Sequence, residues 1–540
     1  MVGLAARGAA PTLATPSPAG GRRPPLASRV PRRSFRPQSA RRCRSTLGLL
    51  AVAALWGAPA RALETLKLQL PLLDTTFTVR VSELATPERL LSGNSDLAQL
   101  DRATNGRLGR HLRELFQTPL PLQSRDLVDN VAGTALFDQV MLLASSLVRV
   151  EGLPPDQDGS QLVAAFARLP AGTPLTLLSL LQAMPGEVAS IDLERAFEAL
   201  QRLQRQQRLG RELVERLPAV SRDPSLSARG SLPTVSRTLS LPVRHRSQPL
   251  RLEVVTPVQG GNGRLVLISH GLWDGPAGFT GWADALASRG YSVVLPYHPG
   301  SDKRQQQAML SGKAPPPSPD ELRERPLDLS AVLDAVGSGA LPALAGVRGD
   351  RVVVMGHSWG ATTALQLGGV PPSSRRLRQR CNDLGDPDRN LSWLLQCSFL
   401  SSADRASLAD PRVIAVAAVS PPLELLFDQG AASAMGARGL LISGTDDWVV
   451  PSGPEAIDRF SGPHRLGHQL VLVRGGDHFN LRGPRSQAGA PLAPLLLAWT
   501  DAAFQAGDAV RPAPGVAPLL RPEGWGSAAM PMVEASSAAP

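Results

Sequence analysis

Residues 351–361 read RVVVMGHSWGA, a short apolar run followed by Gly-His-Ser-Trp-Gly. The run has the β-branched composition of a buried strand, and the residues from Ala361 onward (ATTALQL) have helical periodicity. The pattern G-x-S-x-G is weak by itself in a chain with 50 Gly residues. Between a strand and a helix, however, it predicts a sharp turn that exposes the Ser358 hydroxyl, with Gly356 and Gly360 leaving room for the backbone.

A serine hydroxyl is a poor nucleophile unless a base and an acid that orients the base lie nearby. Asp447 follows a later expected strand in the segment GTDDWVVP, and its neighbour Asp446 is the alternative acid. His478 lies in the loop after the next strand, where Asp477 is a further candidate acid. The order Ser358, Asp447, His478 predicts a catalytic triad. Asp447 is favoured by its spacing, three residues after Gly444 and four before Pro451, at the turn that follows the strand.

Two backbone N–H groups are expected to stabilise the negative charge that forms when such a serine attacks a carbonyl group. One belongs to Trp359, the residue after the predicted nucleophile. The other is expected from the segment SHGLWDGP, where Leu272 is favoured and Trp273 is the alternative. The sequence contains no metal-ligand spacing and no dinucleotide fingerprint, so we expect neither a metal nor a cofactor.

Beyond about residue 238, strands and helices alternate, which predicts an α/β fold with a mostly parallel sheet and crossover helices. The expected strands are Leu250–Thr256, Arg264–His270, Tyr291–His298, Arg351–His357, Arg412–Ser420, Gly439–Gly444 and Gln469–Val473. The expected helices are Trp282–Arg289, Leu327–Val336, Ala361–Leu367, Pro454–Phe460 and Leu495–Phe504. Earlier in the chain, alternating residues in ETLKLQLPLLDTTFTVRV suggest a small hairpin.

Several segments together resemble a known family: SHGLWDGP, HPGS, RPLDLSAVLDAV, GHSWG, GTDDWVVP and GGDH. They are similar to bacterial relatives of platelet-activating-factor acetylhydrolase and to predicted dienelactone hydrolases, over roughly residues 240–505. Residues 63–207 resemble a domain of unknown function found ahead of such hydrolases in cyanobacteria. The resemblance implies an α/β-hydrolase fold and cleavage of carboxylic esters, including acyl esters of phospholipids. Dienelactone hydrolases use a cysteine where this chain has Ser358.

The sequence predicts five segments, of which the fourth is the α/β-hydrolase domain. They are an Arg-rich leader with a signal peptide (1–62), a mainly helical domain (63–207), a linker (208–237), the α/β-hydrolase domain (238–508) and a disordered tail (509–540). The leader combines basic residues with a short apolar stretch and an A-x-A motif, which predicts cleavage after Ala62. We therefore expect an exported protein, periplasmic or secreted.

The net charge of +11 is confined to the leader. Residues 1–62 hold eleven Arg and no acidic residue, which leaves 46 basic side chains against all 46 acidic ones in the rest of the chain. A uniform excess of positive charge would favour nucleic-acid binding, but this distribution predicts none. No later segment is apolar over the length that a spanning helix needs, so no transmembrane segment is expected in the mature chain.

An insertion of about forty residues, roughly 370–411, separates the helix after Ser358 from the next strand, and such insertions commonly form a cap over an active site. Cys381 and Cys397 lie within it and form either a disulfide or two buried thiols. Its apolar residues are interpreted as either an acyl pocket or packing of the cap: Trp393, Leu394, Leu395, Phe399 and Leu400. A cluster of Arg375, Arg376, Arg378 and Arg380 is interpreted as a solvated face, with an anionic head group as the alternative.

These patterns together predict an exported serine hydrolase that cleaves a small-molecule or lipid ester through an acyl-enzyme. Two alternatives stay open. An amidase or peptidase would use the same triad chemistry. A non-catalytic binding protein could use the same scaffold, with the helical domain as its working part. The sequence does not predict the oligomeric state.

Overall fold

The computed structural model describes residues 62–70, 75–118, 130–131, 133–156, 159–169, 173–174, 176–460, 462–484 and 490–538. Within this part of the chain the residues group into one compact unit. The predicted leader lies outside the described residues except for Ala62, so the signal peptide and its cleavage remain predictions. No helix in the described part is both long and apolar enough to cross a membrane.

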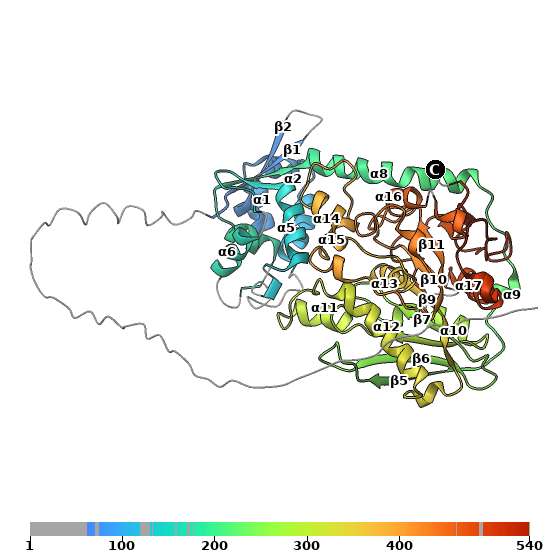
Figure 1. The fold of residues 1–540 in the computed structure, drawn as a ribbon. Coiled ribbons are helices and arrows are strands. Elements are labelled where there is room, and N and C mark those ends of the chain that lie inside the picture. The colour runs from blue at the N-terminus through green and yellow to red at the C-terminus, as the bar shows by residue number, and fades with distance from the viewer. Residues whose placement is uncertain are drawn as a thin grey trace, which may run out of the picture. The chain divides into compact units, whose positions relative to one another are not determined.

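The N-terminal residues form a four-stranded sheet with helices packed on it (Figure 1). The strand order is β2-β1-β4-β3, built from β2 (Thr75–Arg80), β1 (Thr65–Leu70), β4 (Val188–Asp192) and β3 (Val148–Val150). The antiparallel pairing of β1 with β2 confirms the predicted hairpin. The helical elements are η2 (Val81–Ala85), α1 (Pro87–Ser92), α2 (Asp96–Ala103), α3 (Arg107–Gln117), α5 (Ala135–Leu147), α6 (Ser160–Arg168) and α7 (Leu177–Ala183).

This region is therefore more mixed than the mainly helical domain expected for residues 63–207. Strands β3 and β4 have only three and five residues. Runs this short show too little alternation to be detected against the helical pattern around them. Strand β4 nevertheless lies parallel to β1 in the middle of the sheet, where its backbone is paired on both sides.

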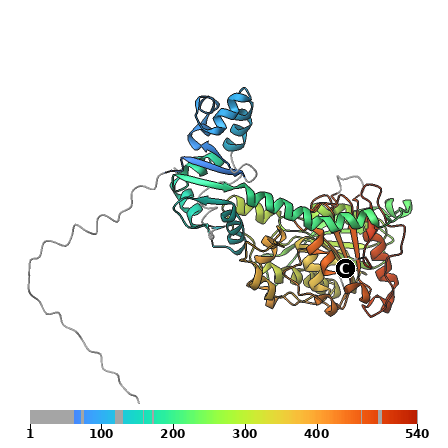
Figure 2. The ribbon, with the colours of Figure 1, turned by 90° about the horizontal axis from the view of Figure 1, so that it is seen from above.

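The expected linker at 208–237 is wrong at both ends. Helix α8 (Leu193–Arg216) continues through its first nine residues, and strand β5 (Thr234–Leu241) begins before its end. The buried side of α8 includes Gln207 and Gly210 beside Leu213 and Val214, so its apolar stripe is interrupted where the linker was expected to begin. Gly210 brings the helix close to α16 (Ser452–Glu455), because an added Cβ would overlap the side chain of Ser452. Figure 2 shows α8 extending from the small sheet across the large domain.

The large domain is built on a nine-stranded sheet of order β13-β12-β11-β10-β9-β7-β8-β6-β5. Neighbouring strands from β12 to β8 are parallel, whereas β6, β5 and β13 are antiparallel to their neighbours. The strands not yet bounded are β6 (Leu250–Pro257), β7 (Arg264–Ser269), β8 (Ser292–Pro296), β9 (Arg348–His357), β10 (Val413–Val419), β11 (Arg438–Gly444), β12 (Gln469–Val473) and β13 (Met532–Glu534). All seven expected strands are present, so the mixed α/β architecture is confirmed.

Helices cover both faces of this sheet, which is why its central strands are continuous apolar runs (Figure 1). Helices α10 (Thr280–Ala287) and α17 (Ala493–Gln505) pack together on one face. Helices α12 (Glu321–Gly337) and α13 (Trp359–Leu367) pack together on the other face. The remaining elements are short: α9 (Pro224–Ser227), η3 (Pro276–Phe279), α11 (Lys303–Leu310), η4 (Pro342–Leu344), α14 (Arg375–Arg380), α15 (Ser392–Cys397), η5 (Ala403–Arg405), η6 (Ala431–Ala434), η7 (Ile457–Arg459), η8 (Pro463–Leu466) and η9 (Gly507–Val510).

The tail expected to be disordered at 509–540 is instead packed on the large domain over its described residues. Strand β13 pairs with β12 and completes that edge of the sheet. Trp525 and Met532 are buried in the core on that side. A segment rich in Pro, Ala and Gly can order in this way because the sheet edge supplies its backbone partners and a few large side chains supply the burial.

Candidate active site

Ser358 lies at the turn between strand β9 and helix α13, at the carboxyl end of the sheet. Its backbone has φ 54° and ψ −123°, a strained conformation for a residue other than glycine. The turn is tight, because a Cβ added at Gly356 would overlap the backbone of Gly360, and one added at Gly360 would overlap the carbonyl of Ser269. The two glycines of the motif therefore allow Ser358 to occupy this turn.

His478 and Asp447 lie together and form a hydrogen bond, with 3.0 Å between His478 Nδ1 and Asp447 Oδ2. Asp447 is completely buried, and its Oδ1 accepts hydrogen bonds from the backbone N–H groups of Val449 and Val450. When Nδ1 donates to the carboxylate, Nε2 of His478 is left free to accept a proton. The pair is thus arranged as a base with its orienting acid.

The two alternative acids point elsewhere. Asp446 Oδ1 accepts a hydrogen bond from Arg211 of helix α8 at 3.0 Å. Asp477 Oδ1 accepts hydrogen bonds from the backbone N–H groups of Phe479 and Asn480, which closes a local turn. Neither carboxylate is hydrogen-bonded to the imidazole of His478, so the geometry favours Asp447.

His357, the residue before Ser358, ties the loop of His478 to the serine turn. Its Nε2 lies 2.8 Å from the backbone oxygen of His478, and the two imidazole rings are 4.7 Å apart. The four strands from β9 to β12 are adjacent and parallel. Ser358, Asp447 and His478 therefore all follow the carboxyl ends of these strands, on the same side of the sheet. Burial lowers the pKa of His357 well below its usual value, which favours the neutral ring. The sequence assigned no role to His357.

The loop after β7 lies directly against Ser358. A Cβ added at Gly271 would be 3.2 Å from the Cβ of Ser358. The N–H of Trp273 donates to Ser301 at 2.7 Å, which removes the alternative oxyanion donor. The N–H groups of Leu272 and Trp359 have no acceptor in the described part of the chain. The two predicted donors are therefore the ones still available beside the serine.

Arg325 of helix α12 holds this loop from inside the domain. Its Nη1 donates to the carbonyl oxygen of His270 at 2.7 Å, and its Nη2 donates to that of Gly271 at 3.2 Å. Its Nε donates to the hydroxyl of Ser301 at 2.9 Å, and the side chain is almost fully buried. Arg325 begins the segment RPLDLSAVLDAV, but no pattern in that segment places it beneath the loop.

Asp328, one turn further along α12, is the centre of a buried ionic cluster. It accepts hydrogen bonds from His245, His298 and Arg246, each at 2.7 Å for the closest pair of atoms. Burial alone would raise the pKa of Asp328, but these hydrogen bonds hold it below its usual value. Burial, together with the charge of Arg325, lowers the pKa of His298 to about 4.

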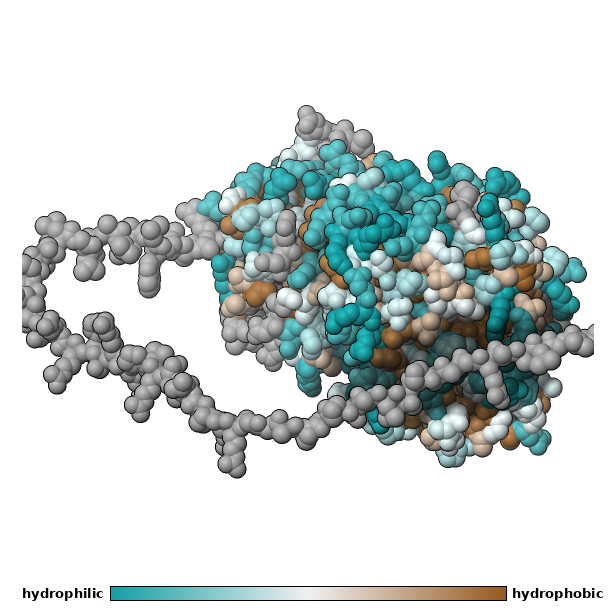
Figure 3. All heavy atoms as spheres, in the orientation of Figure 1, coloured by the Kyte–Doolittle hydropathy of each residue, from teal (hydrophilic) through white to brown (hydrophobic). Residues whose placement is uncertain are grey.

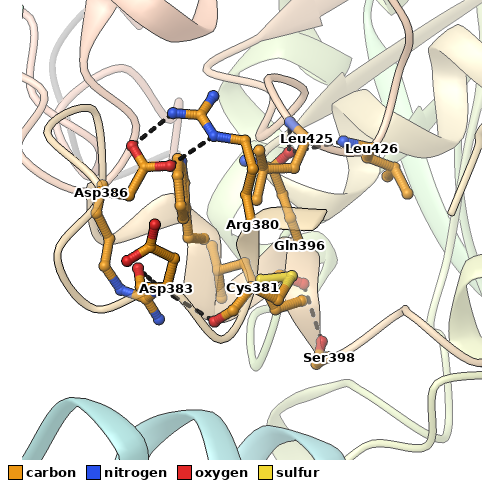
Figure 4. The surroundings of a disulfide bond; sticks show 12 residues. Arg380, Cys381, Asp383, Asp386, Gln396, Ser398, Leu425 and Leu426 are labelled. Atoms are coloured by element: carbon orange, nitrogen blue, oxygen red, sulfur yellow. Dashed lines mark hydrogen bonds and ion pairs between the residues drawn. A yellow bond between two sulfur atoms is a disulfide. The ribbon is translucent and has the colours of Figure 1, made fainter. Parts of the chain in front are cut away.

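The insertion expected at about 370–411 lies between α13 and β10 and contains a disulfide between Cys381 and Cys397 (Figure 4). Trp393 is buried and donates to Glu424 at 3.0 Å, while the ring of Phe399 packs on that of Trp359. These two contacts favour the packing interpretation over an acyl pocket for both side chains.

The arginine cluster of this insertion is paired with acidic residues, while Arg375 and Arg378 are still more than half exposed to solvent. The pairs are Arg375 with Asp428, Arg376 with Glu424, Arg378 with Asp404, and Arg380 with Asp386, Asp388 and Glu424. Their charges are largely compensated within the protein, so this cluster does not favour an anionic head group.

In comparisons with known proteins, no protein-family model matches this chain, and no curated protein matches it significantly. Within the described residues, no group of His, Cys, Asp and Glu side chains is arranged to hold a metal ion.

Proposed function

We propose that the protein is a serine hydrolase of carboxylic esters with an α/β-hydrolase fold. The observation that carries the proposal is the strained backbone of Ser358, φ 54°, at the end of a central strand. The preceding residue, His357, joins this turn to the loop of His478, which is hydrogen-bonded to Asp447. Such strain persists only where the surrounding structure enforces it, and it is concentrated at functional sites.

In the proposed reaction, His478 Nε2 takes the proton of the Ser358 hydroxyl as its oxygen attacks the ester carbonyl carbon. The N–H groups of Leu272 and Trp359 stabilise the oxyanion of the tetrahedral intermediate. The intermediate collapses to an acyl-serine, and the leaving alkoxide takes the proton from His478. Water then attacks the acyl-serine, with His478 as the base again, and releases the carboxylic acid. Asp447 keeps the imidazole in the required tautomer throughout.

Substrates with apolar groups are favoured because apolar side chains are exposed beside the base and the acid. Trp448 follows Asp447, Phe479 follows His478, and both aromatic side chains are exposed. Exposed aromatic groups at the mouth of a site favour apolar substrates such as acyl esters. A non-catalytic binding protein is disfavoured because it would gain nothing from the strain at Ser358.

Labelling with a fluorophosphonate probe tests the nucleophile. We expect the wild-type protein to be labelled and Ser358→Ala to be unlabelled. Ser420→Ala is a matched control, because Ser420 is also buried, also has a positive φ of 48°, and follows the neighbouring strand β10. Labelling of Ser358→Ala at the wild-type level would refute the proposal, as would an unlabelled wild-type protein that is folded.

A matched pair of substrates tests the bond that is cleaved. We expect a p-nitrophenyl ester to be hydrolysed faster than the p-nitroanilide with the same acyl group, and Ser358→Ala to hydrolyse neither. Faster release of p-nitroaniline would replace the esterase proposal with an amidase on the same three residues.

We also propose that the protein is exported and that its leader is removed. The disulfide between Cys381 and Cys397 supports this proposal, because such bonds persist in oxidising compartments. N-terminal sequencing of the protein made by its native cells is expected to give a chain that begins at Leu63. An intact leader on the protein isolated from the cytoplasm would contradict it.

A further inference from the structure

A cavity of about 690 Å³ lies between the N-terminal helices and the insertion of the large domain. Helices α5 and α8 form one side of the cavity, and the chain from Leu384 to Leu394 forms the other. Its large apolar lining residues include Leu143, Leu147, Leu200, Leu203, Leu394 and Trp448. The volume is within the usual range for sites that bind small organic ligands.

Part of the apolar lining of this cavity is left uncovered by the protein. Leu200 is 51% exposed and Trp448 is 46% exposed, and both side chains line the cavity. By contrast, Figure 3 shows mainly hydrophilic side chains over the outward side of α8. Apolar side chains exposed inside a hollow, on a helix whose outer side is polar, indicate a binding site for an apolar group.

The cavity adjoins the candidate active site on the side of the acid and the base. Trp448, in the cavity wall, directly follows Asp447, and its ring lies 6.1 Å from that of Phe479. The ring of Phe479 in turn lies 5.5 Å from the imidazole of His478. From α8, Gln206 lines the cavity, while the neighbouring Gln207 donates to the backbone oxygen of Asp447 at 3.1 Å.

Helix α5 connects the cavity with the oxyanion side of the same site. Near its start, Phe137 packs against the same small apolar cluster as Trp273 of the loop after β7. Further along, α5 contacts helix α15 of the insertion and contributes Leu143 and Leu147 to the cavity. The helix therefore crosses from the oxyanion loop to the cavity, and the N-terminal domain forms part of the surroundings of Ser358.

Two arginines in the cavity wall have unsatisfied nitrogen atoms. Arg389 is buried and donates through Nη1 to the carbonyl oxygens of Cys381 and Asp383, but its Nη2 has no partner among the described residues. The buried Nε of Arg202 also has no hydrogen-bond partner among the described residues, although its Nη1 lies 3.5 Å from the carbonyl oxygen of Arg389. Buried donors without acceptors are costly, so they indicate an acceptor supplied by a ligand.

The charges around the cavity favour an anionic acceptor. Three arginines line it, Arg195, Arg202 and Arg389, against a single carboxylate, Glu198. Arg195 is paired with Asp192, which leaves Arg202 and Arg389 as the cations without a carboxylate partner in the described structure. An anion that accepts hydrogen bonds from guanidinium groups binds more strongly than a neutral acceptor.

We propose that this cavity binds the non-reacting part of the substrate, a long hydrocarbon chain that carries an anionic group. The chain lies along the leucines of α5, α8 and α15, and the anionic group, a carboxylate or a phosphate, is bound by Arg202 and Arg389. The substrate of Ser358 is then an ester of an anionic amphiphile, and the N-terminal domain selects it. This assignment rests on the proposed esterase function, but the cavity can be tested without it.

Binding to the Ser358→Ala protein tests the cavity independently of catalysis. The probe is cis-parinaric acid, a fluorescent long-chain carboxylate, and its methyl ester is the neutral comparison. We expect the acid to bind more tightly than the ester and Ala199→Trp, which fills the cavity from α8, to weaken both by at least about tenfold. Gln204→Trp, on the exposed outward side of the same helix, is expected to leave both affinities unchanged.

The charge component is tested by Arg202→Gln, with Arg205→Gln as the control on the outward side of α8. We expect Arg202→Gln to remove most of the preference for the acid over its methyl ester, and Arg205→Gln to keep it. Equal binding of the two probes by the parent protein, or equal effects of Ala199→Trp and Gln204→Trp, would overturn the proposal.

Turnover then shows whether the cavity serves Ser358. With p-nitrophenyl acetate and dodecanoate, Ala199→Trp is expected to retain acetate hydrolysis and to lose at least about tenfold in kcat/KM for dodecanoate. A long-chain ester with a terminal carboxylate on the chain, the monoester of a dicarboxylic acid, is expected to be hydrolysed faster than the neutral ester of the same chain length if the anion is a carboxylate. The ester with a terminal phosphate on the chain is expected to be the faster one if the anion is a phosphate. If the wild type hydrolysed neither p-nitrophenyl ester, the esterase function alone would be refuted. If Ala199→Trp kept the chain-length preference of the wild type, the cavity assignment alone would be refuted.

Discussion

Two loops flank Ser358, and the protein holds them in different ways. The loop that carries Leu272 is held from within the large domain, by the buried guanidinium of Arg325 on helix α12. The loop that carries Asp447 is held from outside, by Gln207 and Arg211 of helix α8. The first support is a buried arginine that is joined to the cluster of Asp328 through Glu321, since Glu321 contacts both Arg325 and Arg246. The second is a pair of contacts from the helix that leads out of the N-terminal sheet.

The position of the oxyanion loop is thus set within the large domain, whereas the position of the acid loop depends on contacts from the N-terminal region. Buried charges are expensive to expose and are little affected by salt, so the oxyanion loop should be rigid and sensitive to pH. Contacts across a helix surface are weaker, and the charged one is screened by salt. The position of the acid should therefore be the more easily altered of the two.

The largest effect is expected from Asp328→Ala, which removes the centre of the buried cluster. Arg246, His245 and His298 would lose a shared partner inside the protein. Breaking a buried ionic cluster by removing one member costs about 3 kcal/mol or more of unfolding free energy. Urea unfolding measures the loss. Asp334→Ala, on the same helix but exposed, is the control and is expected to cost less than about 1 kcal/mol. Equal losses of unfolding free energy in the two variants would contradict a stabilising role of the buried cluster.

The same cluster predicts how stability depends on pH. The pKa of His298 is about 4 in the folded protein, against an ordinary value of 6.5, so between these values the unfolded chain binds more protons. Folding is therefore destabilised as the pH falls from 6.5 towards 4, by up to about 1.4 kcal/mol per pH unit from this group.

The unfolding free energies of wild type and His298→Gln, measured across that range, isolate this contribution because the carboxylates titrate in both. The difference between the two proteins is expected to change steadily with pH below 6.5 and to be constant above it. Parallel curves throughout the range would show that His298 does not supply the pH dependence.

A smaller effect, and one on activity, is expected from Arg325→Lys. A single ammonium group cannot replace the two nitrogens that bind the carbonyl oxygens of His270 and Gly271. The N–H of Leu272 would then be misplaced, with kcat for ester hydrolysis falling about tenfold and KM unchanged. Arg323→Lys, exposed on the same helix, is the control. A rise in KM without loss of kcat would assign Arg325 to substrate binding in place of loop positioning.

Some strands and helices of the large domain could be predicted from the sequence, and others could not. The large sheet was predictable because its central strands are buried on both faces and therefore appear as continuous apolar runs, such as Val352–Met355. The edge strands β5 and β13 were missed, since one lies in a polar segment and the other has three residues in a Pro-rich and Ala-rich tail. Helix α8 was cut short because Gln207 and Gly210 occupy its buried side.

Within the candidate site, the residues that follow strand ends were predictable and the residues that hold them were not. Ser358, Asp447 and His478 are each placed by local strand and turn patterns, together with their order along the chain. Arg325 and Gln207 act from helices distant in sequence, and nothing in their local pattern indicates a partner. Their roles depend on how α12 and α8 pack, which is tertiary information.

The smallest effect is expected from Arg211→Ala, which removes the charged contact to the acid loop. Its partner Asp446 is about half exposed, so the pair is expected to contribute about 0.2–1 kcal/mol at low salt and less at high salt. Gln207→Ala removes the buried, uncharged contact to Asp447 and is expected to cost about 1 kcal/mol regardless of salt. Unfolding measured at low and high salt distinguishes the two. If Arg211→Ala had the larger, salt-independent effect, the acid loop would be held by charge as firmly as the oxyanion loop, and the contrast between the two supports would fail.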